Sequence, residues 1–270
     1  MRGIFPCRIN KLRYLQKVVV FNPIFSDNLS NESRKGSEMK LLSTGNPKLM
    51  KGEKKGYLSF VLHLAPATLS GKEVCPKRTA GCTAACLNTA GRGGMYKTGE
   101  TTNAIQQARI RKTALFWFNR EEFLNQLVKD IKLGIKQAEK KGMIPSFRLN
   151  GTSDLSWEKY EVVDGKNIFE MFPEVQFYDY TKVLGRKVGD IKNYHLTFSN
   201  ADGNINDVLA AKQAGLNIAV VFKKELPEKH LGLKVINGDD TDLRFLDEKN
   251  VIVGLVAKGK AKKDTTGFVV

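Results

Sequence analysis

The sequence lacks any apolar run close to the roughly 20 residues that a helix needs to span a bilayer. It also lacks a secretory signal, because the apolar stretch 15–25 is interrupted by Lys17, Asn22 and Pro23 and is followed by no small-residue cleavage site. We therefore expect a cytoplasmic protein without membrane contact.

Acidic residues are scarce. The chain has 28 of them against 44 lysines and arginines, a formal net charge of +16. Such a charge favours phosphate-rich partners, so a nucleic acid or a nucleotide is the expected partner, although a merely basic surface has the same composition. No strand is followed by a glycine-rich dinucleotide fingerprint, which argues against a Rossmann cofactor fold.

Cysteine is rare, with four in 270 residues, yet Cys75, Cys82 and Cys86 fall within a short segment. In a reducing compartment this pattern predicts metal binding before disulfides. Thiolates suit zinc or an iron–sulfur cluster, and three of them leave one position open. His63 would complete a zinc site with three cysteines and one histidine. The spacing matches no standard zinc knuckle, and packed or surface thiols are the structural alternative.

Two parts are predicted along the chain: a poorly ordered extension at 1–38, and a single α/β domain at 39–270 with a cysteine-rich loop at 71–99. About six to eight short apolar runs alternate with helical patterns and polar tips, which favours a partial or complete parallel (β/α) barrel. An open doubly wound sheet is the alternative. The expected strands are 57–64, 146–149, 175–178, 194–198, 217–222, 234–236 and 251–256.

Helical patterns cover 101–118 and a second segment that begins at Asn119. Asn119 and Glu122 resemble a capping box, and Gly142 is placed to end this helix.

Polar residues at loops and strand ends are the candidate site. Asn88 and Arg92 belong to a glycine-rich segment that forms either an anion-binding nest or a flexible turn. Arg148 is unusual in a strand, and the Asn150, Ser153 and Asp154 that follow suit substrate binding or proton transfer; helix capping is the alternative for the last two.

The next strand ends bring further titratable groups. Asp179 is a candidate base or nucleophile, Lys182 a phosphate ligand, and Tyr178 a stacking platform, with rim packing as the alternative. Ser199 also follows a strand. Asp239 belongs to an acidic turn that suits a hard cation or ribose, while Asp242 and Arg244 read as a simple ion pair. His195 and His230 do not read as catalytic.

Several blocks resemble the phage gene product 88 family: 42–47, 75–94, 148–154, 176–182, 194–199 and 238–240. The resemblance runs from about residue 40 to the C-terminus. It implies a tailed-phage or prophage origin, hence the cytoplasm of a host cell, and it implies no particular activity.

The cysteine triplet after the first strand of a partial barrel is also similar to radical S-adenosylmethionine enzymes, although those space their cysteines three and two apart rather than six and three. Barrels such as the guanine transglycosylases are a third comparison, but their zinc motif is not matched.

We predict a phage metalloenzyme that binds an iron–sulfur cluster through Cys75, Cys82 and Cys86, with S-adenosylmethionine as a further candidate cofactor and with Asp154, Asp179 and Lys182 as catalytic groups. The alternatives are a zinc-containing nucleic-acid-binding protein without catalysis and a base-exchanging barrel.

Overall fold

The computed structural model describes residues 39–45 and 47–270. Residues 40–270 form one compact unit. The predicted extension at 1–38, which includes Cys7, lies outside the described residues. Within the described part of the chain, no helix is long and apolar enough to cross a membrane.

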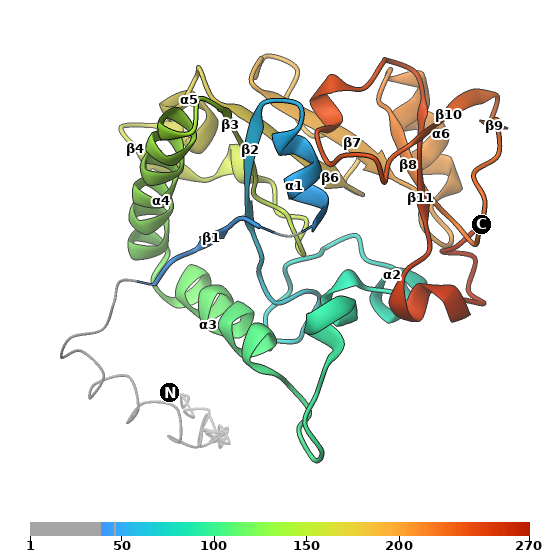
Figure 1. Ribbon diagram of the computed structural model, residues 1–270, viewed down its shortest axis with the longest axis horizontal. Helices are drawn as coiled ribbons and strands as arrows, with labels where there is room; N and C mark the ends of the chain where they lie inside the picture. Colours follow the sequence, from blue (N-terminus) through green and yellow to red (C-terminus); the bar gives the residue numbers. More distant parts are fainter. Residues whose placement is uncertain (1–38, 46) are drawn as a thin grey trace, which may run out of the picture. The chain divides into compact units, whose positions relative to one another are not determined.

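A nine-stranded sheet organises this unit (Figure 1). Its spatial order is β1-β2-β3-β6-β7-β8-β11-β10-β9. The strands are β1 (Leu42–Ser43), β2 (Tyr57–Leu62), β3 (Ile144–Arg148), β6 (Gln176–Thr181), β7 (Tyr194–Ser199), β8 (Ile218–Phe222), β9 (Lys229–His230), β10 (Leu233–Asn237) and β11 (Ile252–Val256). A separate hairpin joins β4 (Glu161–Val163) to β5 (Lys166–Asn167).

The seven central strands are all parallel, and only β1 and β9 at the two edges run antiparallel to their neighbours. From β2 to β8 the spatial order follows the chain order, without the reversal of a doubly wound sheet. The α/β class and the seven expected strands are confirmed. The sheet does not close into a barrel, because β1 and β9 leave two open edges, and it has nine strands rather than six to eight.

Helices connect the parallel strands. They are α1 (Pro47–Glu53), α2 (Ala80–Ala84), α3 (Ala104–Phe118), α4 (Arg120–Lys140), α5 (Ile168–Met171) and α6 (Ile205–Gln213). Short 3₁₀ turns are η2 (Leu87–Thr89), η3 (Gly91–Gly94), η4 (Trp157–Lys159), η5 (Arg244–Leu246) and η6 (Gly259–Lys263).

The predicted start and end of the second long helix, α4, are confirmed. The side chain of Asn119 accepts a hydrogen bond from the backbone N–H of Glu122, and it donates to the Glu122 carboxylate at 2.6 Å. Gly142 follows the helix with a φ of 63°, a conformation that glycine adopts without steric cost.

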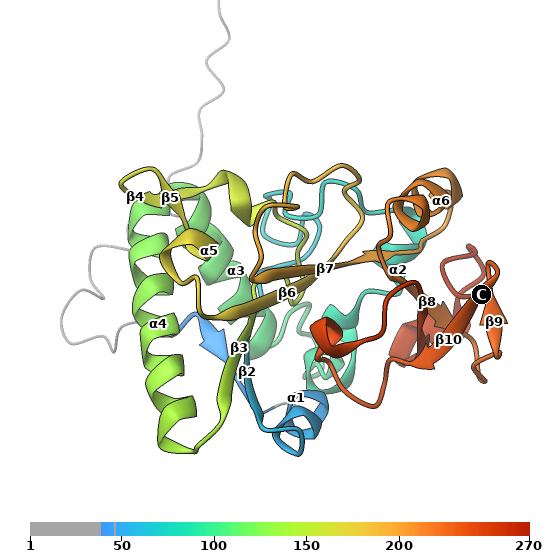
Figure 2. The same cartoon turned by 90° about the horizontal axis from the view of Figure 1, so that it is seen from above.

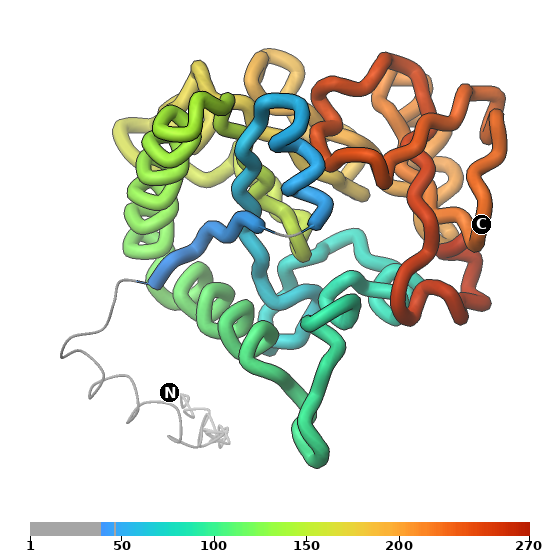
Figure 3. Tube along the Cα trace, in the orientation of Figure 1, coloured from blue at the N-terminus to red at the C-terminus, as the bar shows by residue number. Residues whose placement is uncertain are grey.

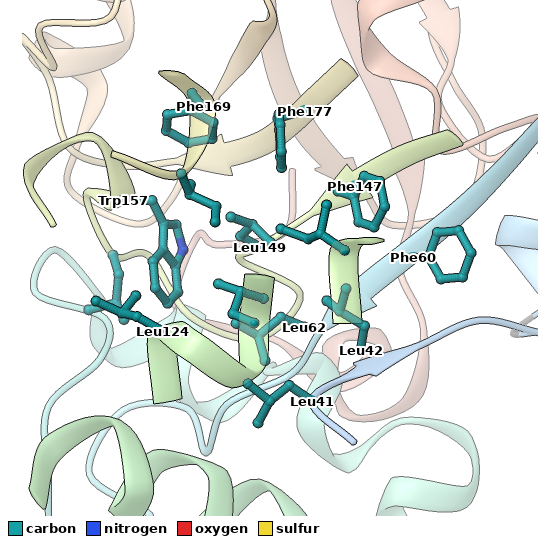
Figure 4. Packing of buried hydrophobic residues seen from close by; sticks show 14 of the residues in the cluster. Leu41, Leu42, Phe60, Leu62, Leu124, Phe147, Leu149, Trp157, Phe169 and Phe177 are labelled. Atoms are coloured by element: carbon teal, nitrogen blue, oxygen red, sulfur yellow. The ribbon is translucent and has the colours of Figure 1, made fainter. Parts of the chain in front are cut away.

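One side of the sheet, here called the apolar face, carries the main hydrophobic core. Phe60, Phe147 and Phe177 lie on adjacent strands with ring centroids 5.1 and 5.7 Å apart. Helix α4 approaches closely at Gly134, where a Cβ atom would lie 3.0 Å from the Phe147 ring. Figure 4 shows how Leu41, Leu124 and Trp157 continue this packing.

The opposite side of the sheet, here called the polar face, carries side chains of another kind. It bears Ser59, Ser146, Arg148, Tyr178, Tyr180, His195 and Thr197, which alternate along their strands with the core residues. Phe245 of η5 packs against Tyr178 on this face, with ring centroids 5.5 Å apart. Figure 2 shows α4 and α6 on one side of the sheet and α1 on the other.

Candidate functional site

Three cysteines line one pocket of about 220 Å³, here called the cysteine pocket. Cys75 lies in the loop after β2, Cys82 lies in α2, and Cys86 precedes η2. All three are free thiols and partly buried. The pocket is also lined by Pro66, Ala67, Thr68, Leu69, Arg78, Thr83, Asn88 and Thr89. The fold therefore brings together the three side chains that the sequence singled out.

Loops that follow two other parallel strands hold the cysteine loop in place. After β3, the backbone N–H of Asp154 donates to the carbonyl of Val74 at 2.8 Å. After β7, the Asp202 carboxylate accepts from the N–H of Gly81 at 3.0 Å and is hydrogen-bonded to the Thr79 hydroxyl. Because both loops leave the carboxyl ends of their strands, the pocket lies at that edge of the sheet, where α/β proteins place their ligands.

The C-terminal segment also packs on α2, although it is far away in the sequence (Figure 3). A Cβ atom at Gly81 would overlap the side chains of Thr266, Asp202 and Phe268. Glycine is therefore required where the cysteine loop, the β7 loop and the C-terminal segment meet.

Burial governs the protonation of the thiols. It raises the pKa of Cys75 to about 12 and also raises that of Cys86. Each sulfur accepts a backbone hydrogen bond, Cys75 from Ala67 at 3.5 Å and Cys86 from Asn88, which partly offsets the effect of burial. Both thiols are consequently protonated at neutral pH unless a positive ion compensates the charge of the thiolate.

Metal coordination would require the sulfurs to move closer. Among residues 39–45 and 47–270, no three His, Cys, Asp or Glu side chains stand close enough together to hold a metal ion. His63, the candidate fourth zinc ligand, has a pKa lowered to about 3, first by burial and then by the charges of Arg109 and Arg148. Thiolates are the ligands that a soft metal prefers, and the metal site stays a prediction.

Asp154 and Lys182 lie beside the cysteine pocket. One carboxylate oxygen of Asp154 accepts from the N–H of Lys182 at 2.8 Å, while the other, Oδ1, is buried without a hydrogen-bond partner. Burial raises the pKa of Asp154, whose negative charge in turn raises the pKa of Cys75. The Lys182 charge lowers the pKa of Cys86. These two predicted residues therefore belong to the surroundings of the thiols.

Asn150 and Ser153 build the loop after β3. The Asn150 side-chain oxygen accepts from the Ser153 hydroxyl at 2.9 Å, the N–H of Leu155 at 2.9 Å and the indole of Trp157 at 3.2 Å. These bonds hold the loop that carries Asp154. The predicted substrate contacts of Asn150 and Ser153 remain predictions.

Asp179 lies on the apolar face and is fully buried. Its carboxylate accepts from the N–H of Asn150 at 2.7 Å and the hydroxyl of Tyr194 at 2.9 Å. Burial raises its pKa to about 7, against the lowering effect of Arg148 and of these bonds. Its contacts are those of a residue that holds the β3 loop, and its predicted acid–base role remains a prediction.

Asn88 and Arg92 fall into different surroundings. Asn88 is buried and accepts hydrogen bonds from Arg109 through its side chain and its carbonyl. Arg92 is exposed in η3. The carbonyl of Gly93 accepts from Asn103 and Gln106, so this segment is tied to the start of α3.

A charged cluster covers the polar face. Arg148 donates to the Asp242 carboxylate at 3.1 Å, and Lys48 contacts the other oxygen of Asp242 at 3.2 Å. The Arg148 guanidinium also lies 4.7 Å from the centre of the Tyr180 ring. Burial alone would raise the pKa of Asp242, but Arg148, Lys48 and Arg244 lower it to about 2. The predicted Asp242–Arg244 pair is wrong, because Arg244 is paired with Asp247 at 3.3 Å.

The remaining predicted residues lie at the margins of this cluster. Tyr178 is buried, with its hydroxyl 3.5 Å from Asp242. Asp239 accepts from the N–H of Val256 and the ammonium of Lys258, so it joins the β10 end to β11. Ser199 is partly buried at the end of β7.

Residues 40–270 match the family described as Gene product 88. The chain belongs to the gene product 88 family. No curated protein and no solved structure matches the chain significantly. The predicted family resemblance is confirmed, and the match includes every candidate residue discussed above.

Several site residues of this gene product 88 protein were missed by sequence reasoning. Lys48, Arg109 and Asp202 come from segments that carried no recognisable motif. Asp202 follows a predicted strand, which was a usable signal, whereas the partnership of Lys48 with Asp242 spans distant parts of the chain. Only the sheet order brings such residues together.

Proposed function

We propose that this gene product 88 protein is an enzyme that binds an iron–sulfur cluster through Cys75, Cys82 and Cys86 and acts on a nucleotide or nucleic acid. The observation that carries the proposal is that three thiols from one loop line one pocket at the carboxyl edge of a parallel sheet. Cys75, Cys82 and Cys86 would hold the cluster, which would then have a coordination position open to a small molecule.

The arrangement of the strands supports the same proposal. Parallel strands that follow one another in chain order, as β2, β3, β6, β7 and β8 do, have the connectivity of a (β/α) barrel cut open. The cysteine loop follows the first parallel strand of this series, as in radical S-adenosylmethionine enzymes. The proposed fold class is therefore a partial barrel whose carboxyl edge carries the cluster.

Each neighbouring side chain has a proposed role. Asp154 presents an unpartnered carboxylate oxygen and a pKa raised by burial, so it is suited to hold a proton beside Cys75. The cations of Lys182 and Arg109 lower the pKa of Cys86 and favour its thiolate form. Because Cys75 and Cys86 are protonated when unliganded, metal binding would release protons and weaken at acid pH.

Anaerobic purification and reconstitution with iron and sulfide test the proposal. We expect bound iron, acid-labile sulfide and visible charge-transfer absorption in the wild type. Alanine substitution at Cys75, Cys82 or Cys86 should abolish all three signals, while the matched control Cys7→Ala should keep them.

Zinc in stoichiometric amount, removed by the same three substitutions, would instead favour the zinc-containing nucleic-acid-binding protein. Full iron and sulfide content in the three cysteine variants would contradict any metal role for the pocket.

A further inference from the structure

The polar face holds buried polar atoms without partners on three adjacent strands. They are Nε of Arg148 in β3, the hydroxyl of Tyr180 in β6, and Nε2 of His195 and the hydroxyl of Thr197 in β7. Tyr178 pairs with His195 and Tyr180 with Thr197 across the sheet, so these atoms belong to neighbouring positions on one face. Buried polar groups are nearly always hydrogen-bonded in folded proteins. A bound ligand would supply hydrogen-bond partners for this group of atoms.

The charge around these atoms is positive. Lys48, Arg148 and Arg244 contribute three cationic groups, and the facing carboxylates are Asp242 and Asp247. Nε and Nη1 of Arg244 and one oxygen of each carboxylate also lack a hydrogen-bond partner. A buried surplus of positive charge is stabilised by an anion.

We propose that the polar face of the sheet is a binding site for a phosphate group of a nucleotide-sized ligand, with Arg148, Tyr180 and Thr197 as its donors. This inference deepens the proposed function, on whose substrate class it rests. A guanidinium and two hydroxyls are all hydrogen-bond donors, which suits the oxygens of a phosphate.

Because the cluster is largely buried, we expect it to bind a small ligand rather than a polymer. Thr197 is fully buried, and the side chains of Arg148 and Lys48 keep only 16% and 26% of their surface exposed. We therefore expect a small phosphate compound rather than a duplex or a long single strand at these atoms.

A purely structural role explains Arg148, which pairs with Asp242, but it does not explain the two hydroxyls. The hydroxyls of Tyr180 and Thr197 make no hydrogen bond within the described part of the chain. Tyr180→Phe and Thr197→Val should therefore leave the ligand-free protein as stable as the wild type. Tyr160→Phe makes the same chemical change next to Trp157 and Phe116, in the core on the other side of the sheet, and is the matched control.

Isothermal titration calorimetry of the full chain with inorganic pyrophosphate and with adenosine diphosphate tests the site. We expect each of Tyr180→Phe and Thr197→Val to weaken binding about tenfold, the loss of roughly one hydrogen bond to a charged group. Tyr160→Phe should bind like the wild type.

The proposal is overturned if neither probe binds up to millimolar concentration, or if all variants bind equally. Binding of single-stranded DNA alone, unaffected by the two substitutions, would also overturn it and place the nucleic-acid contact on the outer surface.

The outcome can be separated from that of the iron–sulfur proposal by titrating Cys82→Ala as well. Pyrophosphate binding by a variant without a cluster would support the phosphate site alone. A wild type that assembles a cluster but binds neither probe would leave the cluster proposal standing and reject the phosphate site.

Discussion

The two faces of the same sheet bury different kinds of side chain: aromatic and aliphatic groups on the apolar face, and charged and polar groups on the polar face. On β3, Phe147 points into a stack of aromatic rings under α4, whereas Ser146 and Arg148 point to the other side. The apolar face removes hydrocarbon from water and specifies the fold. The polar face buries charge, which stabilises a fold poorly unless each charge is paired. We therefore expect the apolar face to contribute more to stability than the polar face.

Two buried aspartates make the comparison quantitative. Asp179 on the apolar face has a pKa raised to about 7 by burial, while Asp242 over the polar face has a pKa lowered to about 2 because Arg148, Lys48 and Arg244 outweigh burial. The two aspartates therefore change the stability of the fold in opposite directions as the pH rises. Asp242 contributes stability above about pH 4 that is lost as the pH falls toward 2, whereas Asp179 lowers stability as the pH rises from about 4 to 7.

The largest expected effect is on the apolar face. Phe147→Ala should lower the free energy of unfolding by about 3–5 kcal/mol, because it removes a fully buried ring and leaves a cavity between Phe60 and Phe177. Urea unfolding followed by circular dichroism measures the change. Phe118→Ala, at a ring that is 77% exposed, is the control and should be nearly neutral. Equal losses of unfolding free energy in the two variants would contradict the assignment of Phe147 to the core and Phe118 to the surface.

A smaller loss is expected on the polar face. Asp242→Asn removes the carboxylate that Arg148 and Lys48 contact, and we expect the free energy of unfolding to fall by roughly 2–3 kcal/mol, since both cations keep some contact with water. The same unfolding assay, with the exposed Asp190→Asn as control, measures it. If pyrophosphate at saturating concentration restored the lost stability in Asp242→Asn, the charge surplus of this face would be shown to attract anions. A variant as stable as the wild type would show that the ion pairs are dispensable.

The smallest loss of stability is expected from Asp179→Asn, which removes a buried carboxyl whose ionisation opposes folding. Near pH 4 the carboxyl is still protonated in the folded chain and partly protonated in the unfolded chain, and the variant should be close to the wild type, whereas at pH 8 the variant should be the more stable protein. Urea unfolding at the two pH values gives the comparison. Parallel pH profiles for wild type and variant would mean that Asp179 does not titrate near pH 7 in the folded state.

Much of the fold was predictable because it depends on local patterns. The apolar runs at 57–64 and 217–222 predicted β2 and β8, and the cap at Asn119 predicted the start of α4. The two-residue edge strands β1 and β9 were not predicted, since strands this short carry no periodicity. Whether the sheet would close could not be predicted either, because closure depends on the pairing of edge strands that are distant in the chain.

The candidate site was predictable only where its residues are close together in the sequence. The three cysteines lie in one loop, so their shared pocket followed from their spacing. The contacts of Asp179 and Asn150 did not follow, because polar residues at strand ends serve equally well as loop supports or as ligands. The two residues are hydrogen-bonded to each other, and their predicted catalytic and binding roles remain predictions.

By itself the sequence determined the α/β class, the membership in the gene product 88 family and the segment that carries the thiols. Each of these depends on residues that are neighbours in the sequence. The tertiary structure decided which side of the sheet each polar side chain occupies and which charges meet there. Lys48, Arg148 and Asp242 are joined only through the order of the strands, and such long-range contacts leave no mark in any local pattern.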